Sequence, residues 1–350
     1  MNVPVVTSMD TVTPSKMEFL WKGRFPLGTL SMLVGPPGVG KSKLARYIAA
    51  RVSVGGSWPD GSPCAQGHAI LLGDEDGLGD VVAPELLGFS ADRAYVKHLA
   101  MSDGEDATAF SLQHDLKHLD KLIGDTGARF FALDPVSDFT DGTPLGKEEH
   151  VRPLLKKLAK LAGHHKAAAL GLLHLNKDEE KAAINRILGA AGFTGVARAV
   201  YLVEYHPADL QLPMVQRRRV LATVKVNGFP APESLSFLLM PTGQYKWESC
   251  PDIPDADALL TGKRGFYEQA VKAKDDDPDV DVFLRDLLNP LPMEAKKVFS
   301  KGLEAGFTRS QLNTAKQRLK IKSEKVTGQK DGGWVWKLPP WELGHLEEKI

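Results

Sequence analysis

The chain has 350 residues, 43% hydrophobic and 25% charged, which is enough apolar material for a sizeable core and for more than one domain. Its 44 basic and 44 acidic residues cancel, so overall charge neither requires nor rules out a polyanionic partner. Cys64 and Cys250 form no C-x-x-C pair, which argues against a disulfide framework or a zinc site. No apolar run approaches the roughly 18 residues that span a bilayer, and the first residues lack a signal-peptide pattern. We therefore expect a cytoplasmic protein with no membrane partner.

The composition changes along the chain in a way that predicts two domains joined by a linker. We expect a weakly ordered lead-in over 1–19, an α/β domain over 20–245, a linker rich in proline and aspartate over 246–262, a helical and hairpin domain over 263–339, and a tail over 340–350.

Short apolar runs in the first domain predict buried strands. They cover residues 30–34, 70–72, 130–133, 170–173, 199–203 and 220–224. Helical patterns lie between several of them, for example the leucines at 154, 155, 158 and 161. Alternating helices and fully apolar strands predict an α/β fold with a mainly parallel sheet covered on both faces. In such sheets ligands bind at the carboxyl ends of the strands, where charged residues collect in this sequence.

The stretch after the first strand is a P-loop. It reads Gly35-Pro36-Pro37-Gly38-Val39-Gly40-Lys41-Ser42 and satisfies the pattern G-x-x-x-x-G-K-[ST] between a strand and a helix. Glycines let the backbone N–H groups curl around an anion, and the helix N-terminus adds partial positive charge. Lys41 is expected to reach the β- and γ-phosphates of ATP, and Ser42 to hold Mg²⁺.

Three further strand ends carry candidates for the hydrolysis of the γ-phosphate. Asp134 follows the third strand, where a carboxylate can hold Mg²⁺ through water. Glu75, in an acidic tip after the second strand, is our candidate for activating water, with Asp74 or Asp76 as alternatives. His174 follows the fourth strand, where it can hydrogen-bond the γ-phosphate or simply be a histidine satisfied at a strand end.

A segment rich in small residues, 178–197, follows His174 and carries Lys181 and Arg186. If subunits form a ring, this segment can face the bore and contact nucleic-acid phosphates. The alternative is a surface loop without that role.

Residues 293–337 are predicted to form a helix, a turn, a second helix and a hairpin, the layout of a winged helix. Thr308 and Gln311 form a capping box for the second helix. This stretch holds 11 Lys or Arg against 4 Asp or Glu, a local excess of +7 in a neutral protein. If it binds DNA, the helix presents Ser310, Asn313, Lys316 and Gln317 outward, and Arg309 and Lys330 contact phosphates. The alternative is a module that binds a protein such as a primase or an initiator.

These motifs together resemble the RepA-like ATPases, RecA-fold relatives of the DnaB replicative helicases found on plasmids, phages and other mobile elements. The resemblance covers roughly residues 18–240. The residues that carry it are Leu20-Trp21 through Ser42, Gly73-Asp74-Glu75-Asp76, Leu133-Asp134-Pro135, His174-Leu175-Asn176-Lys177, Gly189 through Arg198 and Lys225-Val226-Asn227. The tail resembles the winged helix often fused behind that core.

The resemblance implies a hexameric ring with nucleotides between subunits. It makes Glu75 the catalytic carboxylate, Asp134 the Walker B residue and His174 the γ-phosphate sensor. Arg198 falls where the family places an arginine finger that reaches a neighbour's γ-phosphate. Lys225 resembles the lysine of the DnaB-type K-x-R pair, although Asn227 replaces its arginine.

The implied function is a helicase that moves along single-stranded DNA in the replication of a mobile element. A nucleotide-switched loading ATPase that unwinds nothing is the alternative from another class. A P-loop enzyme acting on a small molecule is a third.

Overall fold

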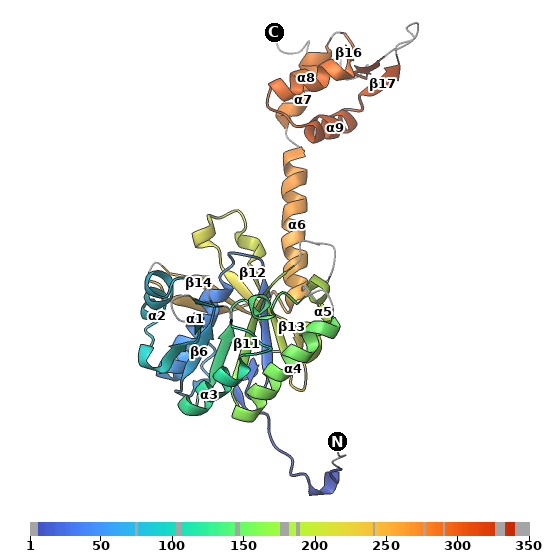
Figure 1. Cartoon of the computed structure of the whole chain (residues 1–350). Coiled ribbons are helices and arrows are strands. Elements are labelled where there is room, and N and C mark those ends of the chain that lie inside the picture. The colour runs from blue at the N-terminus through green and yellow to red at the C-terminus, as the bar shows by residue number, and fades with distance from the viewer. Residues whose placement is uncertain are drawn as a thin grey trace. The chain divides into compact units, whose positions relative to one another are not determined.

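The computed structural model describes residues 6–73, 76–102, 107–108, 110–143, 148–175, 182–186, 190–240, 242–275, 278–289, 291–325 and 333–339. The chain divides into two compact units, the first ending at Lys263 and the second beginning at Arg264. Figure 1 shows the elements of both units. Helix α6 (Ala256–Asp275) begins in the first unit, and its later turns belong to the second.

The first unit is built on a nine-stranded sheet with the order β15-β14-β13-β12-β3-β11-β10-β6-β7. Its strands are β3 (Leu30–Gly35), β6 (Ala69–Leu72), β7 (Val96–His98), β10 (Phe130–Leu133), β11 (Ala168–His174), β12 (Ala199–Tyr205), β13 (Arg219–Val226), β14 (Leu235–Leu239) and β15 (Tyr245–Ser249). The pairs from β12 across to β7 are parallel, and β13, β14 and β15 continue the sheet in antiparallel pairs. The six expected strands and the mainly parallel sheet are therefore confirmed.

Helices cover both faces of this sheet. They are α1 (Lys41–Val54), α2 (Ala83–Gly88), α3 (Leu116–Thr126), α4 (Glu148–His165) and α5 (Ala190–Val196). Short antiparallel strand pairs also lie outside this sheet: β1–β2 (Phe19–Trp21, Phe25–Pro26), β4–β5 (Gly56–Ser57, Pro63–Cys64) and β8–β9 (Met101–Ser102, Ala107–Thr108). The short helical turns η1 to η7 cover residues 9–11, 78–82, 93–95, 136–139, 183–186, 207–209 and 214–216.

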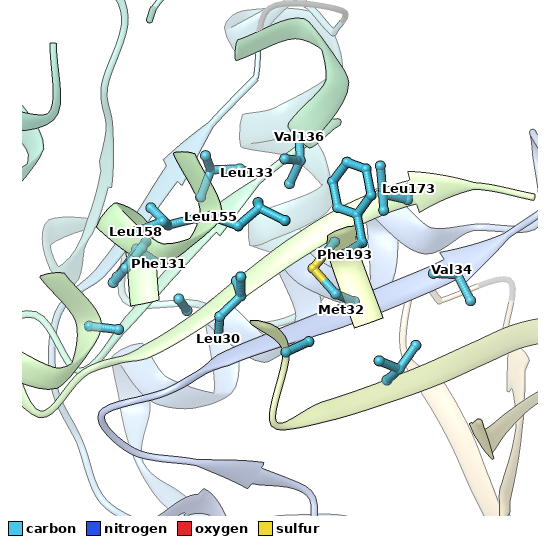
Figure 2. Packing of buried hydrophobic residues seen from close by; sticks show 14 of the residues in the cluster. Leu30, Met32, Val34, Phe131, Leu133, Val136, Leu155, Leu158, Leu173 and Phe193 are labelled. Carbon is cyan, nitrogen blue, oxygen red and sulfur yellow. The ribbon is translucent and has the colours of Figure 1, made fainter. Parts of the chain in front are cut away.

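The core of the first unit follows from the two-residue period of its strands. Alternate residues of β3 point to one face, where they pack against leucines of α4 and against Phe193 of α5, as Figure 2 shows. Leu33 lies between them in sequence, so its side chain points to the other face, where it is also fully buried. Each fully buried Leu or Phe contributes about 2 kcal/mol by leaving water. The P-loop strand is therefore held from both sides.

The stretch 246–262, which we expected to be a linker, contains the end of β15 and the first turns of α6. Only residues 250–255, where the prolines and aspartates stand, lie outside a regular element. Leu259 and Leu260 are buried in the core of the first unit. Lys263 Nζ also donates to the buried carboxylate of Glu204, 2.6 Å away on β12. The start of α6 is thus part of the first unit because apolar side chains and an ion pair fix it there.

The second unit contains the later turns of α6 with α7 (Pro278–Leu288), β16 (Met293–Glu294), α8 (Ala295–Glu304), α9 (Arg309–Arg318), β17 (Lys322–Lys325) and β18 (Trp334–Lys337). The three strands pair antiparallel in the order β16-β18-β17. Its separate core includes Leu284, Val298, Leu312 and Trp336. The capping box of Thr308 and Gln311 is confirmed at the start of α9.

Among the helices that the structure describes, none combines the length and the apolar character needed to cross a bilayer.

Candidate nucleotide site

The P-loop joins the carboxyl end of β3 to the first turn of α1, and its glycines are required by geometry. Gly38 and Gly40 have φ angles of +72° and +100°, which favour glycine. A Cβ on Gly35 would lie 2.3 Å from the carbonyl oxygen of Val203 on the neighbouring strand β12. The loop can therefore curl at the start of α1 only with these residues, which gives the anion cradle expected from the motif.

Lys41 is buried, with 6% of its surface exposed, and its ammonium lies inside the P-loop. Nζ donates to the carbonyl oxygens of Gly35 and Pro36, both 3.0 Å away. It also lies 3.2 Å from Nδ1 of His174. An ammonium has only protons to offer, so Nδ1 accepts in this contact.

The position of His174 follows from strand order. Because β11 lies directly beside β3, with His174 paired to Gly35, the end of β11 is adjacent to the P-loop. The structure thus brings two of the predicted residues, Lys41 and His174, into contact where a γ-phosphate would bind.

Ser42 and Asp134 line one small cavity at the carboxyl edge of the sheet. The backbone N–H of Asp134 donates to the carbonyl oxygen of Leu72, 2.9 Å away. Gly73 lets the chain approach Asp134 closely, because a Cβ there would lie 2.7 Å from the Asp134 carbonyl oxygen. A hydroxyl and a carboxylate are hard oxygen ligands, which fit Mg²⁺ and its waters. The residues present therefore suit the magnesium ion of a bound ATP.

The catalytic carboxylate predicted at Glu75 lies outside the described residues, as does its alternative Asp74. The other alternative, Asp76, is described and forms an ion pair with Arg46 of α1. The guanidinium already occupies this carboxylate, so the pairing disfavours Asp76 as the group that activates water.

Arg198 and Lys225 lie together at the end of the sheet opposite the P-loop. Arg198 precedes β12, and its backbone N–H donates to the carbonyl oxygen of Leu30 at the amino end of β3. Lys225 pairs with Val200 in the antiparallel ladder, and its Nζ donates to the carbonyl oxygen of Thr194, 2.7 Å away. Val203, which lies beside the P-loop, is the fifth residue after Arg198, about 16 Å along the strand. Neither cation belongs to the nucleotide site of its own chain.

The residues predicted to contact nucleic acid are only partly described. Lys181 and Lys330 lie outside the described residues, and Arg186 ends the turn η5, with its side chain also outside them. Asn313 is exposed on α9. The guanidinium of Arg309 lies over the ring of Phe299, with 5.3 Å between its central carbon and the ring centroid.

Lys316 differs from the expectation that it points outward. Its Nζ lies 4.7 Å from the ring centroid of Trp336 and donates to Ser323 Oγ, 2.6 Å away. The long apolar stem of a lysine gains by covering an aromatic ring, so this side chain folds back onto its own domain.

Two residues that the sequence analysis did not single out also lie beside the P-loop. Arg219, at the start of β13, donates through Nε to the carbonyl oxygen of Val39 at 3.3 Å. Its guanidinium lies over the ring of Tyr205, whose hydroxyl donates to the carbonyl oxygen of Gly38 at 3.5 Å. The run of three arginines at 217–219 before a strand was the available signal, but only strand pairing shows that it reaches the P-loop.

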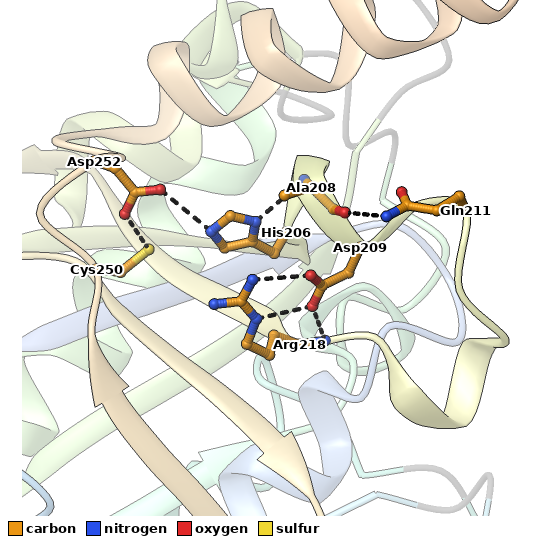
Figure 3. Close-up of polar contacts among 7 residues, drawn as sticks. All are labelled: His206, Ala208, Asp209, Gln211, Arg218, Cys250 and Asp252. Atoms are coloured by element: carbon orange, nitrogen blue, oxygen red, sulfur yellow. Dashed lines mark hydrogen bonds and ion pairs between the residues drawn. The ribbon is translucent and has the colours of Figure 1, made fainter.

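A cluster of His206, Cys250 and Asp252 has its potential ligand atoms within 4.8 Å of one another (Figure 3). Nδ1 of His206 accepts the backbone N–H of Ala208, 3.2 Å away, so the neutral ring carries its proton on Nε2, which faces Asp252. A metal at Nε2 would need the opposite tautomer, which would point Nδ1–H at a backbone donor. Burial also raises the pKa of the Cys250 thiol to about 12. The hydrogen bonds therefore disfavour a metal ion in this cluster.

Comparison with known proteins identifies the family. The crystal structure of a KaiC-like protein from the hyperthermophilic archaeon Pyrococcus horikoshii OT3 aligns with 67% of this chain and 100% of its own, at 14% sequence identity and a TM-score of 0.48. No curated protein matches significantly. A family model described as an AAA domain matches residues 2–180, more than half of the chain, and includes the P-loop, Asp134 and His174. The chain therefore belongs to this AAA domain family and is a P-loop ATP hydrolase.

Proposed function

We propose that the protein is a ring-forming, RepA-like helicase or translocase of the RecA type, which hydrolyses ATP between subunits, moves along single-stranded DNA and acts in the replication of a mobile genetic element. The observation that carries this proposal is the position of Arg198 and Lys225. Arg198 lies at the amino end of β12, about 16 Å along that strand from Val203 beside the P-loop of the same chain, and Lys225 lies opposite Val200, about 10 Å along β12 from Val203.

Such a separation supports action on a neighbouring subunit. Phosphoryl transfer needs a positive charge that stabilises the transition state, and a partner can supply it as an arginine finger. A heterologous contact repeated around a ring would bring the amino end of one sheet to the P-loop of the next subunit. Arg198 is exposed in the single chain. A residue that contacts a neighbouring subunit must be exposed in this way.

The contacts of His174 support a route from nucleotide to DNA. His174 lies against Lys41, and the chain continues from it into the segment proposed to contact DNA. The described part of that segment is held by Asp257 of α6, whose Oδ1 accepts the backbone N–H of Ala183 at 2.8 Å. Lys225 Nζ donates a hydrogen bond to the carbonyl oxygen of Thr194, which lies in α5, the helix in the later part of that segment. A change at His174 would therefore act on a segment tied to the finger residues.

The second unit supports DNA binding through a winged helix. Its order of helix, strand, two helices and two strands, with the sheet order β16-β18-β17, fits that module. The exposed side of α9 contains Ser310, Asn313 and Gln317, and the exposed Lys320 follows the end of the helix. Such side chains suit the edges of bases and phosphates. A primase or an initiator protein is the alternative partner for this surface.

The alternative function is a nucleotide-switched loading ATPase that assembles on DNA through the second unit without unwinding it. The second unit has its own hydrophobic core, so it can present α9 to DNA whether or not ATP is hydrolysed. This separate core favours the loading function. An unwinding assay on a forked duplex separates the two functions. A loader would show DNA-stimulated ATP hydrolysis without strand separation.

The first experiment is the rate of ATP hydrolysis with and without single-stranded DNA, together with the mass of the particle in a non-hydrolysable ATP analogue. Stimulation by DNA and a mass six times that of the chain are expected. A monomer whose turnover ignores DNA would contradict the proposal and favour an enzyme that acts on a small molecule.

A further inference from the structure

Arg46 connects the P-loop helix to Asp76, the last residue of the acidic tip, and to Glu85 of α2. It lies four residues after Ser42 and therefore on the same face of α1. Only 8% of its surface is exposed. Nη2 donates to the carboxylate of Asp76, and Nη1 donates to Oε2 of Glu85 at 2.7 Å. Lys43 adds a second ion pair to Glu85, with 2.9 Å between Nζ and Oε1.

A second anchor holds the chain on the other side of the tip. His98, the last residue of β7, donates through Nε2 to the carbonyl oxygen of Gly73, 2.9 Å away. Gly73 also packs against Asp134, as described above. The chain is therefore fixed at residue 73 by His98 and at residue 76 by Arg46, and residues 74 and 75 stand between these two anchors in the sequence.

The charge of Arg46 also matters for the metal site. Arg46, Asp76, Ser42 and Asp134 line the same cavity. Burial alone would lower the pKa of Arg46, but the hydrogen bonds and charges of Asp76 and Glu85 outweigh it and raise that pKa. The guanidinium thus stays charged and neutralises Asp76. Without it, Asp76 would be a second free carboxylate near Asp134, able to compete for Mg²⁺.

We propose that Arg46 is a positioning residue for ATP hydrolysis: by holding Asp76 it fixes the residue that follows the predicted catalytic carboxylate in the sequence, and it keeps Asp76 away from the metal. The proposal rests on the proposed role of Glu75. Arg46 acts through Asp76 and does not itself contact the nucleotide. A misplacement of about 1 Å in a catalytic group can lower turnover about 100-fold, so a small loosening of this anchor is sufficient.

The test compares Arg46→Leu, Arg46→Lys and Asp76→Asn. We expect kcat to fall about 10- to 100-fold in Arg46→Leu, while the affinity for an ADP analogue changes less than about threefold. Arg46→Lys should recover part of kcat because it restores the charge. Asp76→Asn should lower kcat, and combining it with Arg46→Leu should add little, since both break one contact. In Arg46→Leu the Mg²⁺ concentration for half-maximal activity should shift, and in the double variant, which lacks the free carboxylate, the shift should disappear.

Lys121→Leu is the matched control, because it breaks the exposed ion pair with Asp125 on α3. Its kcat should equal that of the unaltered protein. Normal kcat in folded Arg46 and Asp76 variants would overturn the proposal, and so would a loss of nucleotide affinity that accounts for the whole effect. If Arg46→Leu does not fold, the kcat of Asp76→Asn tests the proposal, because the side chain of Asp76 is more exposed and its replacement disturbs the core less.

Glu75→Gln separates this inference from the assignment of the catalytic carboxylate. If Glu75→Gln is inactive while the Arg46 variants turn over normally, only the role of Arg46 is wrong. If Glu75→Gln keeps normal turnover, the assignment of Glu75 fails, whatever the Arg46 variants do.

Discussion

Two lysines in the first turn of α1 have opposite surroundings. Lys41 is buried inside the P-loop, whereas the side chain of Lys43 is 32% exposed and pairs with Glu85. We expect Lys41→Ala to weaken ADP binding about 100-fold, because charge-assisted hydrogen bonds to phosphate are among the strongest a side chain makes. Lys43→Ala should bind ADP as the unaltered protein does. Titration with a fluorescent ADP analogue measures both, and equal losses would mean that damage to the helix, rather than a missing phosphate contact, causes the effect.

His206 gives the first unit a pH dependence whose sign can be worked out. Burial, helped by the nearby charge of Arg218, lowers the pKa of His206 below its usual 6.5, against the opposing charges of Asp209 and Asp252. The unfolded chain therefore takes up this proton more readily than the folded chain. Stability is fully present above pH 6.5 and falls as the pH drops from 6.5 toward the folded pKa.

Urea midpoints at pH 7.5, 6.5 and 5.5 test this dependence. His206→Asn keeps an acceptor for the Ala208 N–H but removes the titration, so its midpoint should fall less between pH 6.5 and 5.5. His118→Gln, at an exposed position on α3, is the control and should follow the unaltered protein. Asp209 does not contribute in this range, because the hydrogen bond from Arg218 lowers its pKa below 3.8. A parallel fall in all three proteins would mean that another group is responsible.

At the scale of elements, α9 depends on its N-terminal cap. Thr308 Oγ1 accepts the backbone N–H of Gln311, and Oε1 of Gln311 accepts the backbone N–H of Thr308, 2.8 Å away. Thr308→Ala should destabilise the helix by about 1 kcal/mol. The amide protons of its first turns should therefore exchange roughly fivefold faster. Thr314→Ala, in the middle of the same helix, should not accelerate exchange. Hydrogen exchange on the full chain checks this, and unchanged protection in Thr308→Ala would show that packing alone holds α9.

The sequence predicts well those elements whose pattern lies within a few consecutive residues. The six strands were recognised because each is a continuous apolar run, as in β10, where all four residues are buried. β15 does not form such a run, because its aromatic residues Tyr245 and Trp247 alternate with the charged residues Lys246 and Glu248. β7 does not form such a run either. Strand order was not predictable, since pairing joins segments that are far apart in the chain.

The candidate site divides in the same way. The P-loop was recognised because its pattern is contiguous, but the contact between Lys41 and His174 requires β11 to lie beside β3. Arg46 was missed because a single arginine in a helix usually faces solvent, and only the fold brings two carboxylates to it. The linker was predicted too long because proline and aspartate mark its middle, while the buried leucines of α6 that shorten it resemble any helix.

At the scale of the whole molecule, the proposed assembly makes a prediction about mixtures. Lys41→Ala lacks its own nucleotide site but keeps Arg198, and Arg198→Ala keeps its nucleotide site but lacks the finger. Each should be inactive alone. In a ring assembled at random from equal amounts, about a quarter of the interfaces pair an intact P-loop with an intact finger, so about a quarter of the normal turnover should return. The control replaces Lys41→Ala by the double variant Lys41→Ala, Arg198→Ala, which offers no intact finger and should restore nothing. If Arg198 acted on the nucleotide of its own chain, neither mixture would recover activity, since no single chain would contain both groups.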